Sequence, residues 1–264
     1  MAKISSRIEK GKKSSFLQLK NLTKTYETRT GSVSALDDVS FDVSEMQFIS
    51  ILGPSGCGKS TLLFLISGLT PPTKGEIILK GTHIKGPPGG IGMVFQSSIL
   101  FPWRNVWGNI MYSAQLCKIP AAKAEKKASE LLRLTGLAGF EEKYPHELSG
   151  GMQQRVSICR ALIVEPPLLL MDEPFGALDA LTRDKLNLEI QDIWANIKTT
   201  ILFVTHNIQE AVTLGDRVIV LSPRPARIVE DLKIELPRPR TLKGRATKKF
   251  QNYCTHLYKS IGLT

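Results

Sequence analysis

The segment Gly53-Pro-Ser-Gly-Cys-Gly-Lys-Ser60 combines residue types that suit phosphate binding. It fits the pattern G-x-x-x-x-G-K-[ST] in full and stands between an apolar strand, Phe48–Leu52, and a predicted helix over 59–69. Glycines let backbone N–H groups turn towards phosphate oxygens, and the start of the helix adds a favourable dipole. Lys59 is expected to reach the β and γ phosphates of a nucleotide, and Ser60 to offer its hydroxyl to Mg²⁺. The alternative, a plain glycine turn beside a lysine, is disfavoured by the strand–loop–helix context.

Two acids follow a second apolar run, Leu168-Leu-Leu-Met-Asp172-Glu173. A buried strand that ends in carboxylates places them at the carboxyl edge of a sheet, where α/β proteins bind ligands. Asp172 is expected to hold Mg²⁺ through water, and Glu173 to orient and polarise an attacking water. Buried strands often end in an acid, so this signal gains weight only because a phosphate loop precedes it.

A second anion site is indicated at Leu148-Ser-Gly-Gly-Met-Gln-Gln-Arg155. Ser149, Gly150 and Gly151 stand at the start of a predicted helix, where a capping serine and free N–H groups favour an anion. Because the chain already has one phosphate loop, the extra site suggests a phosphate shared between two subunits. The alternative is an ordinary helix cap.

The last segment resembles the signature of the ATP-binding cassette (ABC) family, and the resemblance extends over about 16–230. Tyr26 matches the aromatic residue that stacks on adenine, although core packing is an alternative. Gln96 matches the glutamine that senses Mg²⁺ and the attacking water. Asp179, in Ala177-Leu-Asp, matches the loop that runs along the partner's site. His206, at the end of the strand 201–205, matches the γ-phosphate contact, although a lone histidine is more often structural.

The resemblance implies that ATP and Mg²⁺ are the cofactors and that two chains meet head-to-tail. The implied catalytic residues are Glu173, His206, Gln96 and Lys59. The implied metal ligands are Ser60, Gln96 and Asp172. The implied nucleotide-binding residues are Tyr26, Gly53, Pro54, Ser55, Gly56, Cys57, Gly58, Lys59, Ser60, Thr61, Ser149, Gly150, Gly151 and Asp179. Both a homodimer and a heterodimer of ATPase subunits are compatible with this pattern.

The elements that must position these residues predict an α/β fold. Near-continuous apolar runs at 48–52, 168–172, 201–205 and 217–221, separated by helices, fit a mostly parallel sheet covered on both faces. This is a P-loop NTPase core. Alternating runs at 16–19, 40–43 and 76–81 predict an N-terminal antiparallel β subdomain. The stretch 98–160 lacks such runs and is predicted to be an inserted helical subdomain, with helices over 121–134 and 151–164; a long helix is predicted at about 178–197.

The chain divides into three predicted parts: a basic tail over 1–15, an ABC ATPase domain over 16–230 and a C-terminal extension over 231–264. The chain after Ser222 contains Pro-Arg-Pro segments and is expected to be less regular. No apolar run approaches the roughly 18 residues that a spanning helix needs, and no secretory signal is recognisable. The four cysteines are widely spaced and are expected to be free thiols in a reducing compartment.

The net charge of +11 arises mainly from the tail and the stretch 224–249. Nucleic acid, an anionic membrane surface and simple solvation are all compatible with such a charge, and solvation is favoured. We expect no nucleic acid partner. The ABC family also includes soluble repair and translation ATPases and exporter subunits. Repair members carry a long coiled coil after the phosphate loop and translation members carry two cassettes, whereas this chain has a short insertion and one cassette.

The resemblance therefore implies the ATPase subunit of an importer, peripheral on the cytoplasmic face of the inner membrane, with a separate membrane permease and, indirectly, a solute-binding protein. Two segments resemble the nitrate/sulfonate/taurine import ATPases, a group that also includes riboflavin- and pyrimidine-precursor uptake systems: Leu100-Phe-Pro-Trp-Arg-Asn-Val106 and Leu221–Ile228. The first is expected to dock a helix of the permease, because exposed aromatic and arginine side chains suit interfaces. A surface turn is the alternative. The sequence does not name the solute.

Overall fold

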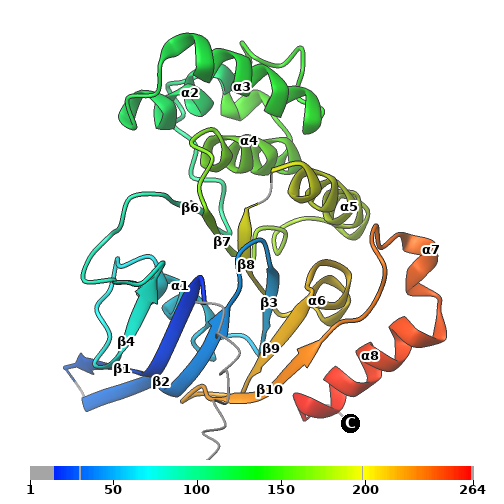
Figure 1. The fold of residues 1–264 in the computed structure, drawn as a ribbon. Coiled ribbons are helices and arrows are strands. Elements are labelled where there is room, and N and C mark those ends of the chain that lie inside the picture. The colour runs from blue at the N-terminus through cyan, green and yellow to red at the C-terminus, as the bar shows by residue number, and fades with distance from the viewer. Residues whose placement is uncertain (1–14, 30, 198, 263–264) are drawn as a thin grey trace, which may run out of the picture.

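The computed structural model describes residues 15–29, 31–197 and 199–262, so the basic tail lies outside the described residues except for Ser15. The first sheet is antiparallel, with strand order β2-β1-β4-β5 (Figure 1). Its strands are β1 (Leu17–Thr28), β2 (Gly31–Val43), β4 (Lys74–Leu79) and β5 (Thr82–His83). The first two strands are much longer than the short alternating runs of the sequence predict, because their outer halves expose side chains of mixed character.

The second sheet has the order β10-β9-β3-β8-β7-β6. Every neighbouring pair is parallel except β9 and β10, which are antiparallel. Its strands are β3 (Phe48–Leu52), β6 (Ile91–Val94), β7 (Leu168–Asp172), β8 (Thr200–Thr205), β9 (Arg217–Leu221) and β10 (Ile228–Lys233). The carboxyl ends of β3, β8 and β7 lie side by side, and they are followed directly by the phosphate-loop segment, His206 and Glu173, respectively.

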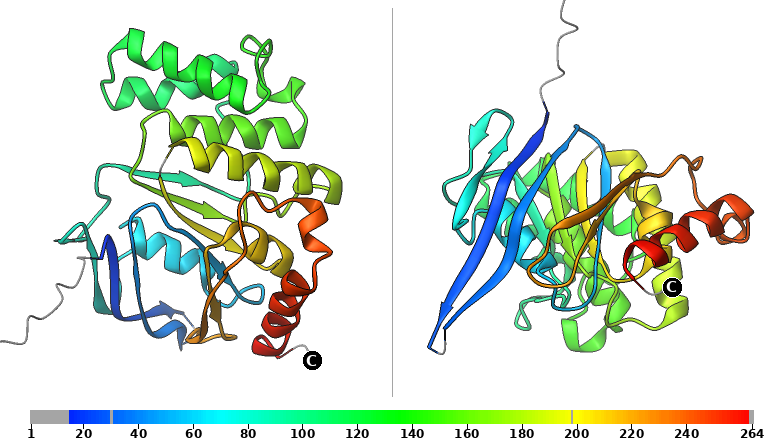
Figure 2. Two further views of the ribbon diagram at one scale, coloured as in Figure 1. Left: turned by 45° about the vertical axis from the view of Figure 1, so that its right-hand side comes forward. Right: turned by 90° about the horizontal axis from the view of Figure 1, so that it is seen from below.

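Alternate side chains of the central strands enter different cores, as the two-residue period of a strand requires. Ile49 and Ile51 of β3 pack with α1 (Lys59–Ile66) and the antiparallel sheet, whereas Phe48 packs with α5 (Ala180–Ile197). Figure 2 shows the antiparallel sheet on one side of the six-stranded sheet and α5 and α6 (Ile208–Leu214) on the other. The six-stranded sheet is therefore covered on both faces.

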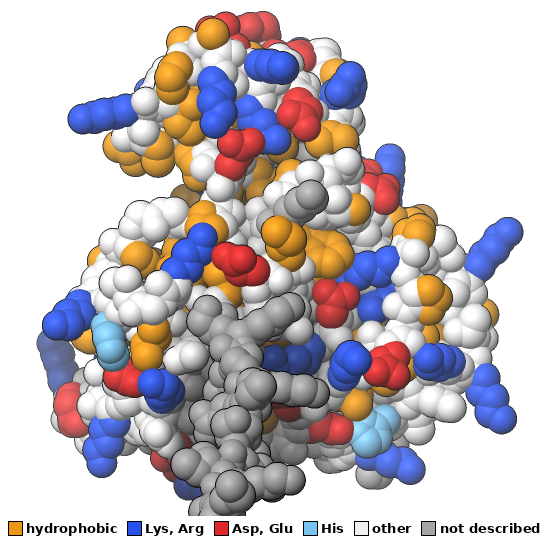
Figure 3. Space-filling view, viewed as in Figure 1, with side chains coloured by type: hydrophobic (Ala, Val, Ile, Leu, Met, Phe, Trp, Pro, Cys, Tyr) orange, Lys and Arg blue, Asp and Glu red, His pale blue; other side chains and the backbone are white. Residues whose placement is uncertain are grey.

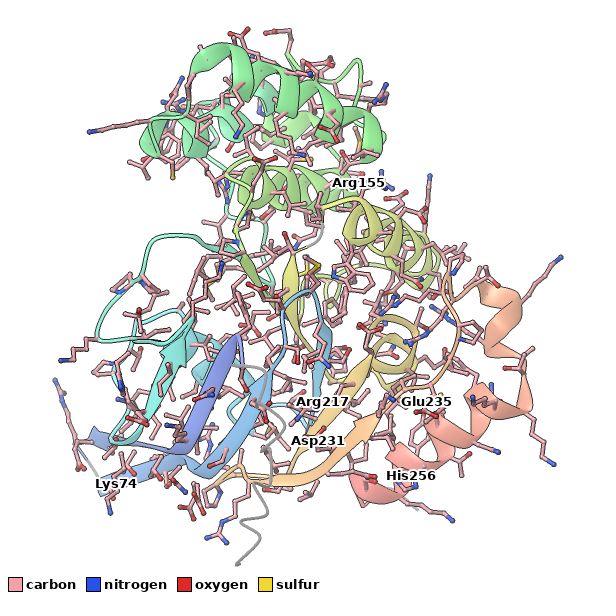
Figure 4. All side chains as sticks on the ribbon, viewed as in Figure 1. Lys74, Arg155, Arg217, Asp231, Glu235 and His256 are labelled. Carbon is pink, nitrogen blue, oxygen red and sulfur yellow. The ribbon has the colours of Figure 1, made fainter. Side chains whose placement is uncertain are left out.

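A helical arm projects from the top of the molecule in Figure 1. It contains α2 (Val106–Leu116), α3 (Ala121–Leu134), a short 3₁₀ helix (Pro145–Glu147) and α4 (Gly150–Leu162). Helix α2 was not anticipated individually; it begins at Asn105, whose side chain accepts a hydrogen bond from Gly108 N at 2.8 Å. Arg155 of α4 reaches Glu189 of α5 through two hydrogen bonds and thereby ties the arm to the sheet layer (Figure 4).

The chain after Ser222 is regular, contrary to the expectation from its prolines. Strand β10 extends the sheet, and α7 (Leu242–Arg245) and α8 (Lys248–Ser260) follow it. The prolines fall in the connections, where they remove no ladder hydrogen bond. Arg217 of β9 pairs with Asp231 of β10, as Figure 4 shows. The predicted boundary between 230 and 231 therefore falls inside a strand.

Lysine and arginine side chains are interspersed with aspartate and glutamate on the face seen in Figure 3. Many charged side chains of the described residues form pairs between elements, for example Arg227 with Asp37 and Lys20 with Glu76. Within the described ranges, no helix combines the length and the apolar character needed to cross a membrane.

Candidate active site

The phosphate-loop segment connects β3 to α1, and its glycines are required by the backbone. Gly56 and Gly58 have φ angles of +75° and +122°, in the region that favours glycine. A Cβ on Gly58 would also come within 2.9 Å of the carbonyl oxygen of Ala35. The structure thus curls the loop around the start of α1, where free N–H groups and the helix dipole favour an anion. Cys57 belongs to the loop; its side chain is buried, and burial raises the pKa of the thiol.

Lys59 is buried under this loop. Only 4% of its side chain is exposed, and its Nζ donates to the carbonyl oxygens of Gly53 and Pro54, each at 3.0 Å. The same Nζ lies 3.1 Å from Oε1 of Glu173. A buried ammonium in a ring of oxygens is positioned to interact with negative charge at the mouth of the loop.

Asp172 and Glu173 end β7 opposite the loop. Oδ1 of Asp172 accepts a hydrogen bond from the Ser60 hydroxyl at 3.0 Å. Burial raises the pKa of Asp172, with a further increase from the charge of Glu173; the Ser60 hydrogen bond and the charge of Lys59 oppose this rise.

Glu173 has neighbours on both sides: Lys59 at Oε1 and Nδ1 of His206 at 2.8 Å from Oε2. Burial raises its pKa, but Lys59 and His206 lower it by more, so the net pKa is below the usual value. The residue also has a φ of +41°, an uncommon backbone conformation for a glutamate. Its carboxylate is therefore ionised at neutral pH and lies between two hydrogen-bonding partners.

Gln96 lies at the other side of this group. Its Nε2 is 3.3 Å from the point that a Cβ on Gly176 would occupy, in the turn that Glu173 begins. The structure therefore brings together Lys59, Ser60, Asp172, Glu173 and His206, with Gln96 beside them.

The remaining predicted residues lie apart from this group. Ser149 caps α4 by accepting from Met152 N at 3.3 Å, and Gly151 approaches Thr182 of α5. Asp179 accepts from Thr182 N at 3.0 Å. Tyr26 is partly exposed on β1, with Nζ of Lys24 at 4.9 Å from its ring centre. Within the part of the chain that the structure describes, no hydrogen bond or ion pair joins Tyr26, Ser149, Gly150, Gly151 or Asp179 to the Glu173 group.

Two contacts at the site were missed by sequence reasoning. Gln154 of α4 donates to the carbonyl oxygen of Phe95, next to Gln96, at 3.1 Å. Glu210 accepts from Thr205 Oγ1 at 2.5 Å, just before His206, and burial raises its pKa. Gln154 could have been proposed from the sequence, because it lies five residues after Ser149 in the same motif. The contact of Glu210 could not, because it depends on the turn between β8 and α6.

Ser60 and Asp172 form a donor set that fits Mg²⁺. A hydroxyl and a carboxylate are hard oxygen ligands, and Mg²⁺ commonly binds one or two carboxylates together with substrate phosphates and waters. The described residues contain no group of three or more histidine, cysteine, aspartate or glutamate side chains that could enclose a metal by themselves. The geometry therefore suits an ion that phosphate oxygens help to hold.

Comparison with known proteins decides the family. The family model described as "ABC transporter" matches residues 36–176, more than half of the chain. The chain belongs to the ABC transporter family. It is an ATP-binding, ATP-hydrolysing member of that family, and the resemblance drawn from its motifs is confirmed.

Several named ABC proteins are close relatives. An uncharacterised ABC transporter ATP-binding protein of Methanocaldococcus jannaschii is 49% identical over 237 residues, which cover 90% of this chain and 88% of the relative. A taurine import ATP-binding protein of Roseobacter denitrificans is 45% identical over 83% of this chain and 82% of the relative. An aliphatic sulfonates import ATP-binding protein of Bacillus cereus is 39% identical over 94% and 97%, respectively.

A solved ABC cassette has the same fold. It is a dimeric ATP-binding cassette in a post-hydrolysis state with ADP and Pi, with a TM-score of 0.72 and 33% identity, covering 84% of this chain and all of the other. The predicted α/β, P-loop NTPase fold class is confirmed by this likeness.

Proposed function

We propose that this ABC ATPase energises the import of a small solute, of the taurine or aliphatic sulfonate type or related to it, through a separate membrane permease. The observation that supports ATP hydrolysis as the energy source is the Glu173 carboxylate held between Lys59 and His206, beside the Ser60–Asp172 pair. The import relatives support the direction and the solute class over the repair, translation and exporter alternatives.

The residues of the group have distinct roles in hydrolysis. The loop Gly53–Ser60 binds the phosphates through its N–H groups, with Thr61 following at the start of α1, and Lys59 neutralises the β and γ oxygens. Glu173 accepts a hydrogen bond, and then the proton, of the attacking water, and Gln96 helps to place that water. His206 orients Glu173 and reaches the γ phosphate. Ser60, Asp172 and Gln96 hold Mg²⁺, which supplies charge stabilisation at the phosphates when bound.

The site is completed by a second copy of the chain. Ser149 and Gly150 are exposed at the start of α4, followed by the buried Gly151, and none of the three has a partner in the Glu173 group among the described residues. The start of this helix is therefore available to the γ phosphate of an ATP bound to the other copy. Asp179 begins α5 next to the same surface. Tyr26 stacks on the adenine of its own subunit. ATP thereby favours a closed head-to-tail dimer, and hydrolysis releases it. The dimeric cassette with ADP and Pi supports this arrangement.

The permease docks on an aromatic cluster beside the arm. Trp103 is 72% exposed, and its ring lies 5.5 Å from that of Phe101, which also packs edge-on against Tyr112 at 4.7 Å. Arg160 lies over Phe101, next to a pocket lined by Ile91, Gly92, Met93, Ser113, Leu116, Cys117, Arg160, Ala161 and Val164. A supported, exposed tryptophan next to a partly apolar hollow suits a helix of a partner protein. The chain is thus peripheral on the cytoplasmic face of the inner membrane, and a solute-binding protein acts on the far side.

Trapping of the closed dimer tests this proposal. Glu173→Gln keeps the hydrogen-bonding shape but removes the proton acceptor, so MgATP should bind without turnover and convert monomer to dimer on size-exclusion chromatography. Lys59→Ala is the matched control and should neither bind ATP in calorimetry nor dimerise. If Glu173→Gln stays monomeric with saturating MgATP, the shared site is wrong.

A further inference from the structure

The loop between β9 and β10 contacts the phosphate loop directly. Nη2 of Arg224 donates to the carbonyl oxygen of Gly56 at 2.7 Å. The two loops together line a shallow pocket formed by Pro54, Ser55, Gly56, Cys57, Pro223 and Arg224. None of the residues implied by the family motifs comes from this second loop. The family motifs therefore do not explain why this second loop contacts Gly56.

The loop that carries Arg224 is held firmly on both sides of that residue. Ala226 is fully buried; its N–H donates to Ala35 O at 3.0 Å, and its carbonyl accepts from Asp37 N at 2.9 Å. Ser222 N donates to Arg227 O at 2.9 Å, and Arg227 forms an ion pair with Asp37. These bonds anchor the loop to β2, so the guanidinium reaches Gly56 from a fixed base.

The contact fixes the orientation of one peptide unit. The bond between Gly56 and Cys57 is trans, so its C=O and N–H point in opposite directions. Gly56 has a φ of +75° and no neighbour within 4 Å of a Cβ position, so no side-chain packing holds this unit, and its other hydrogen bond is the long one from Cys57 N–H to Pro54 O at 3.3 Å. With the carbonyl held by Arg224, the N–H of Cys57 points the other way and donates to Pro54 O. Pro54 O also accepts from Nζ of Lys59, so this N–H lies on the side of the loop that faces Lys59.

We propose that Arg224 is a positioning residue for the phosphate loop: it holds the Gly56 carbonyl outward so that the Cys57 N–H is presented to the nucleotide. The inference rests on the proposed role of Gly53–Ser60 in ATP binding. Arg224 touches the loop and not the reacting atoms. Its effect is on nucleotide affinity, because a loop with a free peptide must be ordered when phosphate binds.

Arg224→Met tests the inference, since methionine keeps much of the length but has no donor. The affinity for MgADP in calorimetry and 1/KM for ATP should each fall about fivefold, the value of one ordinary hydrogen bond, while kcat changes less than about twofold. Arg224→Lys, which can still donate to Gly56, should restore most of the affinity. Lys233→Met is the charge-matched control: it also removes one cation, but Lys233 pairs with Glu235 and contacts neither loop, so nucleotide affinity should be unchanged.

The salt dependence of nucleotide affinity distinguishes two roles of Arg224: orienting the Gly56 peptide and attracting the polyphosphate by its charge. If Arg224 acts by holding Gly56, the ratio of wild-type to Arg224→Met affinity should stay constant as KCl rises; if it only attracts the polyphosphate, the ratio should shrink. The inference is overturned by unchanged affinity in Arg224→Met, by an equal loss in Lys233→Met, or by a ratio that disappears in salt. Failure of the wild-type chain to bind nucleotide would instead refute the proposed function.

Discussion

The two carboxylates at the end of β7 are tuned in opposite directions although they are adjacent. Asp172 is buried with only a hydroxyl as its direct partner, and its pKa is raised. Glu173 lies between Lys59 and His206, and its pKa is lowered. Opposite pKa shifts of neighbouring acids suit different tasks. Glu173 stays ionised as a proton acceptor, whereas the buried negative charge of Asp172 is unfavourable until a bound cation neutralises it.

This difference predicts that Asp172→Asn stabilises the chain while abolishing its function. Because the folded pKa of Asp172 is higher than its unfolded value, ionisation at neutral pH costs folding free energy, and the cost vanishes as pH falls below the unfolded pKa. Urea unfolding without nucleotide should therefore show higher stability for Asp172→Asn at neutral pH but not in acid. MgATP hydrolysis should fall at least about a hundredfold, since bound Mg²⁺ supplies several kcal/mol.

Asp179→Asn is the control with the opposite sign. The pKa of Asp179 is lowered by the hydrogen bond from the backbone N–H of Thr182, so its ionised form favours the fold above its usual pKa and this support is lost as pH falls through the folded value. The amide should be neutral or slightly destabilising at neutral pH. If Asp172→Asn is less stable than the unsubstituted chain at neutral pH, the ionised Asp172 carboxylate contributes favourably to folding, contrary to its raised pKa.

Sequence reasoning found the residues of the Glu173 group because each follows a buried strand within a recognisable spacing. The contacts of Gln154, Glu210 and Arg224 were not accessible in this way. Arg224 meets Gly56 across 168 positions of sequence, through a loop whose path depends on the pairing of Ala226 with β2. Motif spacing carries local geometry; it does not specify which distant loop supports the motif.

At the level of elements, the C-terminal extension is part of the nucleotide-binding body. Phe250, Cys254 and Leu257 on α8 face α6 and β9, where burial raises the pKa of Cys254 to about 11. Arg240 is 5% exposed and donates to the carbonyl oxygens of Val212 at 2.8 Å and Gly215 at 2.5 Å. Burial lowers the pKa of Arg240 to about 10, with a further contribution from Arg238, and it remains charged at neutral pH.

Arg240→Met should destabilise the chain by about 3 kcal/mol in urea unfolding, because several buried carbonyls at the end of α6 lose their donor. Lys233→Met removes an exposed ion pair with Glu235 and should change stability by less than about 0.5 kcal/mol. Equal effects of the two substitutions would mean that water or the backbone satisfies those carbonyls.

Helix α3 was predicted with the bounds that the structure has, since its apolar residues follow a helical period. Helices α2 and α6 and strand β6 were not predicted individually. Strand β6 has only four residues, and α6 has seven, nearly all buried, so neither shows an amphipathic pattern. Periodicity identifies long elements with one exposed face and fails for elements that are as short as β6 or as buried as α6.

At the scale of the whole molecule, the aromatic cluster and the nucleotide group lie on different elements. Trp103 is at the base of the arm, and the reacting residues are at the carboxyl edge of the sheet. Gln154 connects the two regions, since it belongs to α4 and binds the backbone next to Gln96. Gln154 thereby links the arm to the segment that carries Gln96.

This separation predicts that Trp103→Ala uncouples transport from hydrolysis. The isolated chain should retain ATPase activity within about twofold, whereas solute uptake by the reconstituted transporter should fall at least about tenfold, as for an interface tryptophan. Tyr258→Ala, on the exposed side of α8, should affect neither. Parallel loss of ATPase activity and uptake in Trp103→Ala would place Trp103 in the fold and not in the interface.

The burial of Leu52, Val218 and Val220 by α8 has a consequence for synthesis on the ribosome. The strands β3, β8 and β9 are synthesised before α8, so Phe250 and Leu257 leave the exit tunnel only after these strands. Until then the nascent chain presents an uncovered apolar strip beside its last strands, which is the kind of surface that chaperones bind and that promotes aggregation. Helix α8 covers this strip, so nascent chains that stall before α8 is synthesised should leave the strip exposed to chaperones.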